Sequence, residues 1–141
     1  MRFLVIDDSM PMRRIVANVL ARLGHTDVLM AANGREAMKR IESDQIDFVI
    51  TDWFMPEMSG LEFLRKVRDN PSTRDVPIVI ITANASSDDV AQAVRLRVNG
   101  YVLKPFTAEL LKERIASICA SLAEGKACEP AEVAAPVEAP K

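Results

Sequence analysis

A fivefold alternation of short apolar runs and amphipathic segments limits the possible folds of this chain more than any other feature. The apolar runs cover residues 3–6, 28–31, 48–50, 78–81 and 101–103. Short runs of this kind, rich in branched side chains, are typical of strands that are covered on both faces. Because helical patterns separate the runs and the connections are short, the sequence predicts an α/β fold. We expect a doubly wound, five-stranded parallel sheet with helices on both faces.

Apolar residues at helical spacing and helix-capping residues mark the positions of the helices. The predicted helices cover about 10–23, 34–42 and 60–68, followed by a fourth that opens at Ser86 and a fifth that opens after Thr107. Ser9 and Asn33 are expected to cap the first two helices, because short polar side chains accept hydrogen bonds from the free N–H groups of a first turn. In the first helix, Ile15 belongs to the apolar stripe and is predicted to face the core.

Residues 1–123 are expected to form one domain, and residues 124–141 are expected to form a disordered tail. The tail is rich in Ala, Glu and Pro and offers little apolar surface to bury. The formal net charge of −2 argues against a broad electrostatic surface for nucleic acid. No apolar run reaches the length of a membrane span, and the N-terminus lacks a signal-peptide pattern. Cys119 and Cys128 have no metal-ligand spacing and are expected to be reduced thiols, so we predict a cytoplasmic protein.

Polar residues with a particular chemistry follow four of the five apolar runs. They are Asp7 and Asp8, Asp52, Thr82, and Lys104. In a parallel sheet all of these strand ends lie along one edge, where ligands bind in open α/β folds. Contact with solvent would explain any one polar strand end. It explains poorly why the set comprises three acids, a hydroxyl and a lysine, which are the groups that divalent-metal phosphoryl chemistry requires.

Three carboxylates in one place repel each other, and a cation relieves that repulsion. Mg²⁺ is suited to a site with one or two carboxylates, waters and a phosphoryl oxygen. Lys104 and Thr82 can each bind a phosphoryl oxygen. Asp52 is then available as a nucleophile that forms an acyl phosphate. In such a transfer the protein mostly positions the groups and stabilises charge.

Four segments together resemble the signature segments of receiver domains of two-component response regulators. They are Val-Ile-Asp-Asp-Ser at 5–9, Thr-Asp-Trp-Phe-Met-Pro-Glu-Met-Ser-Gly at 51–60, Ile-Thr-Ala at 81–83 and Gly-Tyr-Val-Leu-Lys-Pro-Phe at 100–106. The resemblance extends from residue 2 to about residue 122, in the order and spacing of the family. It implies a flavodoxin-like (βα)5 fold. Residues 12–16, 52–53 and 104–107 are most similar to those of the single-domain chemotaxis regulators within the family.

The resemblance implies a role for each acidic residue. Asp52 would accept a phosphoryl group from a phosphohistidine of a sensor histidine kinase. Asp8 would bind Mg²⁺ directly, and Asp7 would bind it through water. Asp52 and the backbone carbonyl of Phe54 would complete the protein ligands of the metal.

The resemblance also implies the parts of a switch. Thr82 and Lys104 would bind phosphoryl oxygens, together with the backbone N–H of Ala83. Tyr101 would change rotamer when Thr82 moves, and so remodel the face formed by the fourth helix, the fifth strand and the fifth helix. The bond between Lys104 and Pro105 is expected to be cis, as in the family.

Two positions that vary in the family and help to set the lifetime of the phosphoryl group are Phe54 and Asn84. A bulky apolar group at Phe54 would impede the hydrolytic water, whereas Asn84 can orient water as well as block it. The two residues therefore have effects that can oppose each other.

The segment Leu96-Arg97-Val98 departs from the small residues that are usual in the family. A glycine at its centre would take the left-handed conformation that ends a helix, and Arg97 can do so only at a cost. We therefore predict that the fourth helix ends differently, with Asn99 or Gly100 forming the turn.

The function expected from these features is a phosphorylation-driven switch with a protein target, for instance the flagellar motor switch, and not a true enzyme. We expect a monomer or weak dimer, with no DNA-binding domain after residue 122. Alternatives within the same fold are a relay shuttle, a phosphate sink, or a receiver fragment of a longer regulator with the tail as linker. An aspartyl-phosphate hydrolase is disfavoured because Phe54 stands where such enzymes carry a second acid. A flavin domain is disfavoured because residues 7–11 lack the glycine of a phosphate loop.

Overall fold

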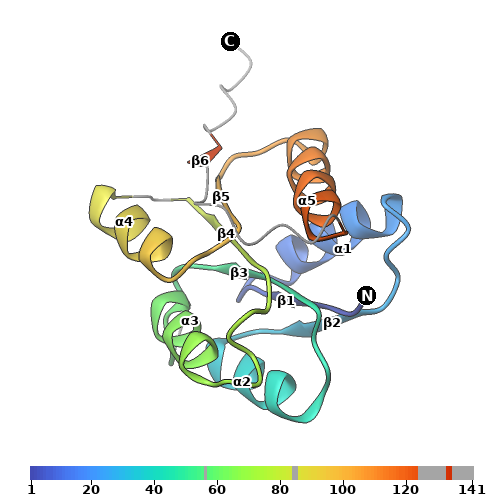
Figure 1. The fold of residues 1–141 in the computed structure, drawn as a ribbon. Helices are drawn as coiled ribbons and strands as arrows, with labels where there is room; N and C mark the ends of the chain where they lie inside the picture. The colour runs from blue at the N-terminus through green and yellow to red at the C-terminus, as the bar shows by residue number, and fades with distance from the viewer. Residues whose placement is uncertain (56, 84–85, 124–132, 135–141) are drawn as a thin grey trace.

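A twisted parallel sheet forms the middle layer of the computed structural model, which describes residues 1–55, 57–83, 86–123 and 133–134 (Figure 1). The strands are β1 (Phe3–Ile6), β2 (Val28–Ala31), β3 (Phe48–Asp52), β4 (Ile78–Thr82), β5 (Gly100–Leu103) and β6 (Val133–Ala134). The helices are α1 (Met10–Arg22), α2 (Gly34–Ser43), α3 (Gly60–Asp69), α4 (Ser87–Arg95) and α5 (Ala108–Ala123). The strand order is β2-β1-β3-β4-β5-β6, and all neighbouring strands pair in parallel. The predicted five-stranded parallel sheet is confirmed, with β6 as an addition at one edge.

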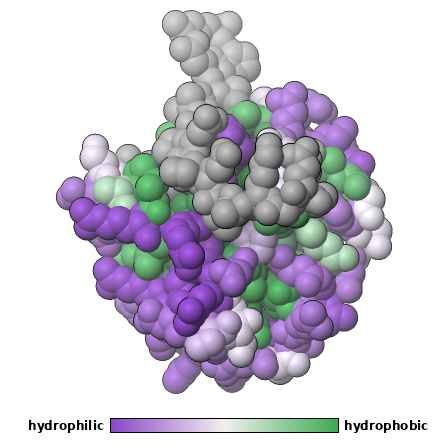
Figure 2. All heavy atoms as spheres, viewed as in Figure 1, coloured by the Kyte–Doolittle hydropathy of each residue, from purple (hydrophilic) through white to green (hydrophobic). Residues whose placement is uncertain are grey.

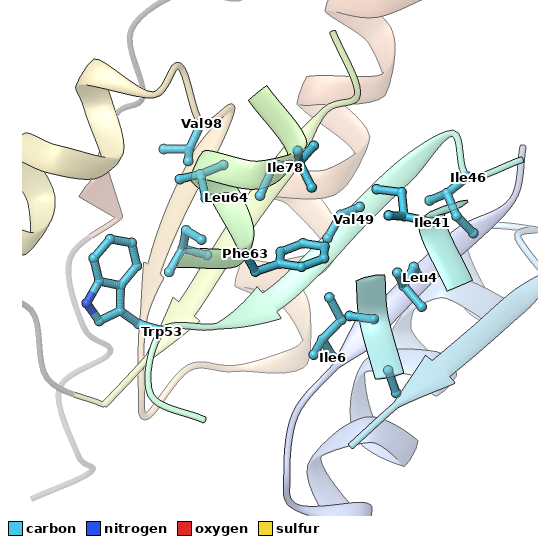
Figure 3. Packing of buried hydrophobic residues seen from close by; sticks show 14 of the residues in the cluster. Leu4, Ile6, Ile41, Ile46, Val49, Trp53, Phe63, Leu64, Ile78 and Val98 are labelled. Carbon is cyan, nitrogen blue, oxygen red and sulfur yellow. The ribbon is translucent and has the colours of Figure 1, made fainter. Parts of the chain in front are cut away.

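Each face of the sheet is covered by its own set of helices and its own apolar cluster. Helices α1 and α5 cover one face, and α2, α3 and α4 cover the other (Figure 1). Alternate side chains of each strand point to opposite faces, so Leu4 and Ile6 pack in one cluster and Phe3 and Val5 in the other. Figure 3 shows the cluster beneath α2, α3 and α4, in which Phe63 of α3 lies over the middle of the sheet. Burial on both faces explains why the strands are continuous apolar runs.

Polar residues cap the helices as the sequence predicts. The side chain of Ser9 accepts a hydrogen bond from the Met12 N–H, and that of Asn33 accepts one from the Glu36 N–H. In the same way, α3, α4 and α5 are capped by the side chains of Ser59, Ser86 and Thr107. Among the residues described, no helix has both the length and the apolarity that a membrane span requires.

Of the segment predicted to be a disordered tail, the structure describes two residues. Val133 and Ala134 form β6 and pair with Tyr101 and Val102 of β5. An ordered strand at these two positions was not expected from the composition. The remaining residues of 124–141 lie outside the described residues, and for them the prediction of disorder stays a prediction.

The prediction for Ile15 is wrong, because its side chain is 45% exposed. The core-facing residues of α1 are Val16, Val19 and Leu20. Ile15 instead lines a groove of about 350 Å³ together with Met12 and Phe106, among others. At 100° per residue, Ile15 lies at the border of the stripe that Val16, Val19 and Leu20 bury, so it faces the groove instead of the core.

The prediction that Arg97 would avoid the left-handed conformation is also wrong. Arg97 has φ 59°, and the α4 helix ends at the C-cap residue Leu96. The Val98 N–H donates to the Ala93 carbonyl at 3.3 Å, and the Arg97 N–H donates to the Val94 carbonyl at 3.0 Å. These two bonds form a Schellman motif, in which the residue after the C-cap is left-handed. Val98 and Ala93 are both fully buried, so the tertiary packing of Val98 stabilises a turn that Arg97 disfavours.

Replacing Arg97 by glycine is expected to stabilise the protein by about 0.5–1 kcal/mol, because glycine takes the left-handed conformation without steric cost. The greater freedom of glycine in the unfolded chain offsets part of this gain. Urea unfolding of the two proteins would measure the difference. As a control, Ala91→Gly places a glycine at an exposed position inside α4 and is expected to destabilise the protein by about 1 kcal/mol. A loss of stability in Arg97→Gly would contradict the prediction.

Candidate functional site

The strand order brings the three predicted acids together at a point where the sheet changes direction. Strand β1 lies between β2 and β3, so the connections after β1 and β3 leave toward opposite faces. Asp7 and Asp8 follow β1, and Asp52 ends β3. The pairing of Ile6 with Thr51 sets the next residues, Asp7 and Asp52, side by side. Such a switch point at the carboxyl edge is the usual place for a ligand site in open α/β sheets.

Lys104 contacts two of these acids from the far side of β4. Its Nζ donates to Asp52 Oδ2 at 3.0 Å and to Asp7 Oδ2 at 3.2 Å. Lys104 directly follows β5, and its N–H donates to the Thr82 carbonyl at 2.8 Å, which fixes where the side chain starts. The side chain of Lys104 is 19% exposed, that of Asp52 11% and that of Asp7 5%. The three charges therefore meet in a site that is partly shielded from water.

Burial and charge act on this group in opposite directions. Burial raises the pKa of Asp7; the Ser9 N–H and the Lys104 charge lower it, but the net change is upward. Burial alone would lower the pKa of Lys104, but its bonds to Asp52 and Asp7 carry it above the usual value. The lysine is therefore held in its charged form, beside an acid that is costly to keep ionised.

The three acids also fit a divalent cation. Each of Asp7, Asp8 and Asp52 offers a carboxylate oxygen, and these oxygens lie within 4.8 Å of one another. Asp8 is exposed, whereas the other two are buried. Carboxylate oxygens are hard ligands that suit Mg²⁺, and an exposed side leaves positions for water and substrate oxygens. The donor set is thus compatible with the predicted metal.

Two contacts hold Asp7 in place. The Ser9 N–H donates to Asp7 Oδ1 at 2.9 Å. Arg13 Nη1 donates to the Asp7 backbone carbonyl at 2.6 Å, from the second turn of α1. Arg13 was not among the predicted site residues. Its position about one turn into the helix that follows the two acids could have indicated it.

The loop after β3 is held close to Asp52. The Phe54 N–H donates to Asp52 Oδ1 at 3.2 Å, and the Phe54 side chain is 52% exposed. Gly60 begins α3, and its N–H donates to the Trp53 carbonyl at 2.8 Å. A Cβ at Gly60 would lie 2.6 Å from the Asp52 carbonyl oxygen and 2.9 Å from Trp53 Cα. Only glycine allows this approach, so Gly60 sets the path of the loop that places Phe54 beside the acids.

The remaining predicted residues lie along β4 and β5. Thr82 ends β4 and is fully buried, one residue after Ile81, which pairs with Asp52. Ala83 is exposed, and Asn84 lies outside the described residues. The bond between Lys104 and Pro105 is cis, as predicted.

Tyr101, the predicted switch residue, is completely buried in this structure. Its ring packs near Trp53, with 6.3 Å between the ring centroids. Among the residues described, its hydroxyl has no hydrogen-bond partner. Burial, followed by the negative charges of Asp89 and Asp52, raises the pKa of Tyr101 to about 12. A buried hydroxyl without a partner costs about 1–3 kcal/mol, so this position of Tyr101 carries an energetic penalty.

The only tyrosine of the chain allows a direct test of this environment. The phenolate absorbance is expected to rise near pH 12 in the folded protein and near pH 10 in urea. Because the folded pKa is the higher one, the contribution to stability is present below pH 10 and is lost as the pH rises toward 12. In Tyr101→Phe the side chain at this position cannot ionise. Its free energy of unfolding, measured with urea, should therefore fall less than that of the parent between pH 10 and pH 12. A midpoint near pH 10 in the folded protein would contradict the burial of Tyr101.

Comparisons with known proteins agree with the fold and identify the family. The chain matches the family described as response regulator receiver domain over residues 3–116. A chemotaxis protein CheY homolog of Campylobacter jejuni is 44% identical over 119 residues, which cover 84% of this chain and 92% of the relative. The chemotaxis protein CheY of Pseudomonas aeruginosa is 43% identical over 118 residues, which cover 84% of this chain and 95% of the relative. The structure of the chemotaxis response regulator CheY4 of Vibrio cholerae superposes with a TM-score of 0.76 at 31% identity, covering 83% of this chain and 97% of that one.

A parallel sheet with acids and a lysine at its carboxyl edge is the arrangement of a response regulator receiver domain, and the chain belongs to that family. Within the family it is similar to the CheY chemotaxis proteins over most of its length. The predicted family and fold class are thereby confirmed.

Proposed function

We propose that Asp52 accepts a phosphoryl group from a phosphohistidine of a sensor histidine kinase. An Asp52 carboxylate oxygen attacks the phosphorus, the phosphorus–nitrogen bond of the donor breaks, and the imidazole leaves as the neutral base after taking up a proton. The observation that carries this proposal is the bond of 3.0 Å between Lys104 Nζ and Asp52 Oδ2 in a shielded site. A cation at this distance from Asp52 can bind an oxygen of an incoming phosphoryl group and stabilise its negative charge.

The other residues of the site position the reactants. Asp7, Asp8, Asp52 and the carbonyl of Phe54 would hold Mg²⁺, which would neutralise the charge of the phosphoryl oxygens. Thr82 would bind a further phosphoryl oxygen once its side chain turns toward Asp52. Phe54 and Asn84 would set the lifetime of the acyl phosphate through the access of water.

The proposed output is a change in the surface formed by α4, β5 and α5. Tyr101 would change rotamer when Thr82 moves and so link the site to this surface. The protein would be a cytoplasmic switch and not an enzyme with a separate substrate. The names of the relatives support chemotaxis as the process, with a downstream protein as partner.

The first test is phosphorylation by a small phosphodonor such as acetyl phosphate in the presence of Mg²⁺. Mass spectrometry is expected to find one added phosphoryl group, lost in Asp52→Asn and after removal of Mg²⁺ by a chelator. Asp69→Asn, at an exposed position on α3, is the matched control and should be phosphorylated normally. The fluorescence of Trp53, which is 3% exposed beside Asp52, should change with Mg²⁺ and again with the donor. Phosphorylation that persists in Asp52→Asn would overturn the assignment.

A further inference from the structure

The outer edge of β5 is occupied by a segment from far along the same chain. Val133 and Ala134 pair with Tyr101 and Val102 in parallel, on the side of β5 opposite to β4 (Figure 1). The paired residues are more than 30 positions apart along the sequence. Without this pairing, β5 would be the last strand of the sheet, and its outward N–H and C=O groups would be free to pair with another chain.

The position of this edge makes the pairing relevant to output. Strand β5 lies between α4 and α5 in space, and β6 lies beside it in Figure 1. Tyr101 and Val102 are both fully buried, each in the apolar cluster on one face of the sheet. The β6 segment therefore lies on the face formed by α4, β5 and α5, which is the proposed contact surface for a partner.

The sequence around β6 suits a short strand that binds at an edge and can leave it. In the sequence, Pro130 and Pro136 stand on either side of the segment, and proline has no N–H to donate to a ladder. Two paired residues make only a short ladder, so another strand can compete for the same edge.

Charge also favours this segment as the occupant. Residues 127–140 contain three glutamates and no lysine or arginine. The end of α4, next to the start of β5, carries the exposed side chains of Arg95 and Arg97. Where Figure 1 places α3 and α4, Figure 2 shows hydrophilic side chains with hydrophobic ones between them. An acidic segment is therefore attracted to the surroundings of the edge.

We propose that the outer edge of β5 is a strand-acceptor site, which the chain's own segment around Val133–Ala134 occupies. A partner that uses this edge then has to displace the segment, so the segment lowers the apparent affinity of the output face. The occupation of the edge stands independently of phosphorylation, whereas its effect on output rests on the proposed function.

Amide hydrogen exchange of the full chain, measured by NMR without any phosphodonor, tests the occupation. Successive N–H groups of a strand point to opposite sides, so one of Tyr101 and Val102 donates toward β6. The double variant Val133→Pro/Ala134→Pro has no N–H groups in β6 to donate to β5, so the segment should leave the edge. The β5 amide then loses its acceptor on β6 and should exchange about two- to tenfold faster, as expected for the loss of one backbone hydrogen bond. The control, Val137→Pro/Ala139→Pro, carries the same number of added prolines outside the described residues. Its β5 exchange should match that of the parent.

Three outcomes would overturn the proposal. The first is equal exchange in the parent and in Val133→Pro/Ala134→Pro. The second is an equal increase in both proline variants, which would point to a general effect of the tail. The third is protection that falls on dilution of the protein, which would identify the segment of a second copy as the occupant. Because no phosphodonor is present, a failure of Asp52 phosphorylation would not produce any of these results.

Discussion

Replacing Lys104 by methionine is expected to slow phosphorylation of Asp52 by about 100- to 1,000-fold, which is the usual loss when one preorganised charge-stabilising donor is removed. Methionine keeps the approximate length and apolar stem of the side chain but has no charge. In the parent, Lys104 Nζ lies 3.0 Å from Asp52 Oδ2, where charge develops during transfer. Single-turnover phosphorylation by acetyl phosphate, followed by mass spectrometry, would measure the rate.

Mg²⁺ binding separates this effect from damage to the site. Lys104 contacts the carboxylates of Asp7 and Asp52, which would also hold the metal, so its loss would remove a competing cation. Lys104→Met should therefore bind Mg²⁺ at least as tightly as the parent, although phosphoryl transfer to Asp52 is slow. Trp53 fluorescence would measure the Mg²⁺ affinity. Lys66→Met, at an exposed position on α3, is the control and should change neither quantity. Weaker Mg²⁺ binding together with slow transfer would instead indicate a distorted site.

Replacing Arg68 by leucine is expected to destabilise the protein by about 3–5 kcal/mol. Arg68 lies in the last turn of α3 and is 8% exposed. Its Nε donates to the Leu96 carbonyl at 2.8 Å and its Nη2 to the Arg97 carbonyl at 3.1 Å. Its Nη1 donates to the carbonyls of Arg74 at 2.9 Å and Val76 at 2.6 Å. Leucine fills part of the volume but leaves these four partly buried acceptors without that donor, and the loss of several hydrogen bonds from a charged donor is costly.

Urea unfolding of Arg68→Leu and of two companion variants would measure this effect. Arg68→Lys retains the charge but cannot reproduce the planar fork of donors, so an intermediate loss is expected. Arg65→Leu, one turn earlier on the exposed side of α3, should change stability by no more than about 0.5 kcal/mol. A loss in Arg68→Leu as small as that in Arg65→Leu would show that water replaces the guanidinium at little cost.

The Arg68 contacts also connect α3 to the turn that precedes β5. Leu96 and Arg97 form the end of α4, and their carbonyls are held by a side chain whose backbone belongs to another helix. This arrangement helps to explain why Arg97 tolerates a left-handed conformation, since the turn is fixed on both sides by Arg68 and by buried Val98. The turn that leads into the proposed output face is therefore determined by tertiary contacts.

Several parts of the protein could be predicted from local sequence because their causes are local. An apolar run indicates a strand that is buried on both faces, and a short polar residue before a helical pattern indicates a helix cap. These signals located β1 to β5, the helix starts at Ser9 and Asn33, and the edge to which Asp52 and Lys104 contribute. Strand pairing in parallel then requires that residues at the ends of strands share one edge, so the composition of the candidate site followed from the order of the elements.

What the sequence alone did not determine depends on contacts between distant segments. The exposure of Ile15 depends on which side of α1 packs against the sheet, and the left-handed conformation of Arg97 depends on contacts of Val98 and Arg68. The bond from Arg13 to the Asp7 carbonyl, the unpartnered hydroxyl of Tyr101 and the pairing of β6 with β5 are likewise set by register and packing across the fold. The physical reason is the same in each case: local propensities differ by about 1 kcal/mol, and burial of a side chain or loss of buried hydrogen bonds outweighs them. The sequence by itself thus determined the elements and the chemistry at their ends, and the tertiary structure decided the distances between those groups and the conformations that local rules disfavour.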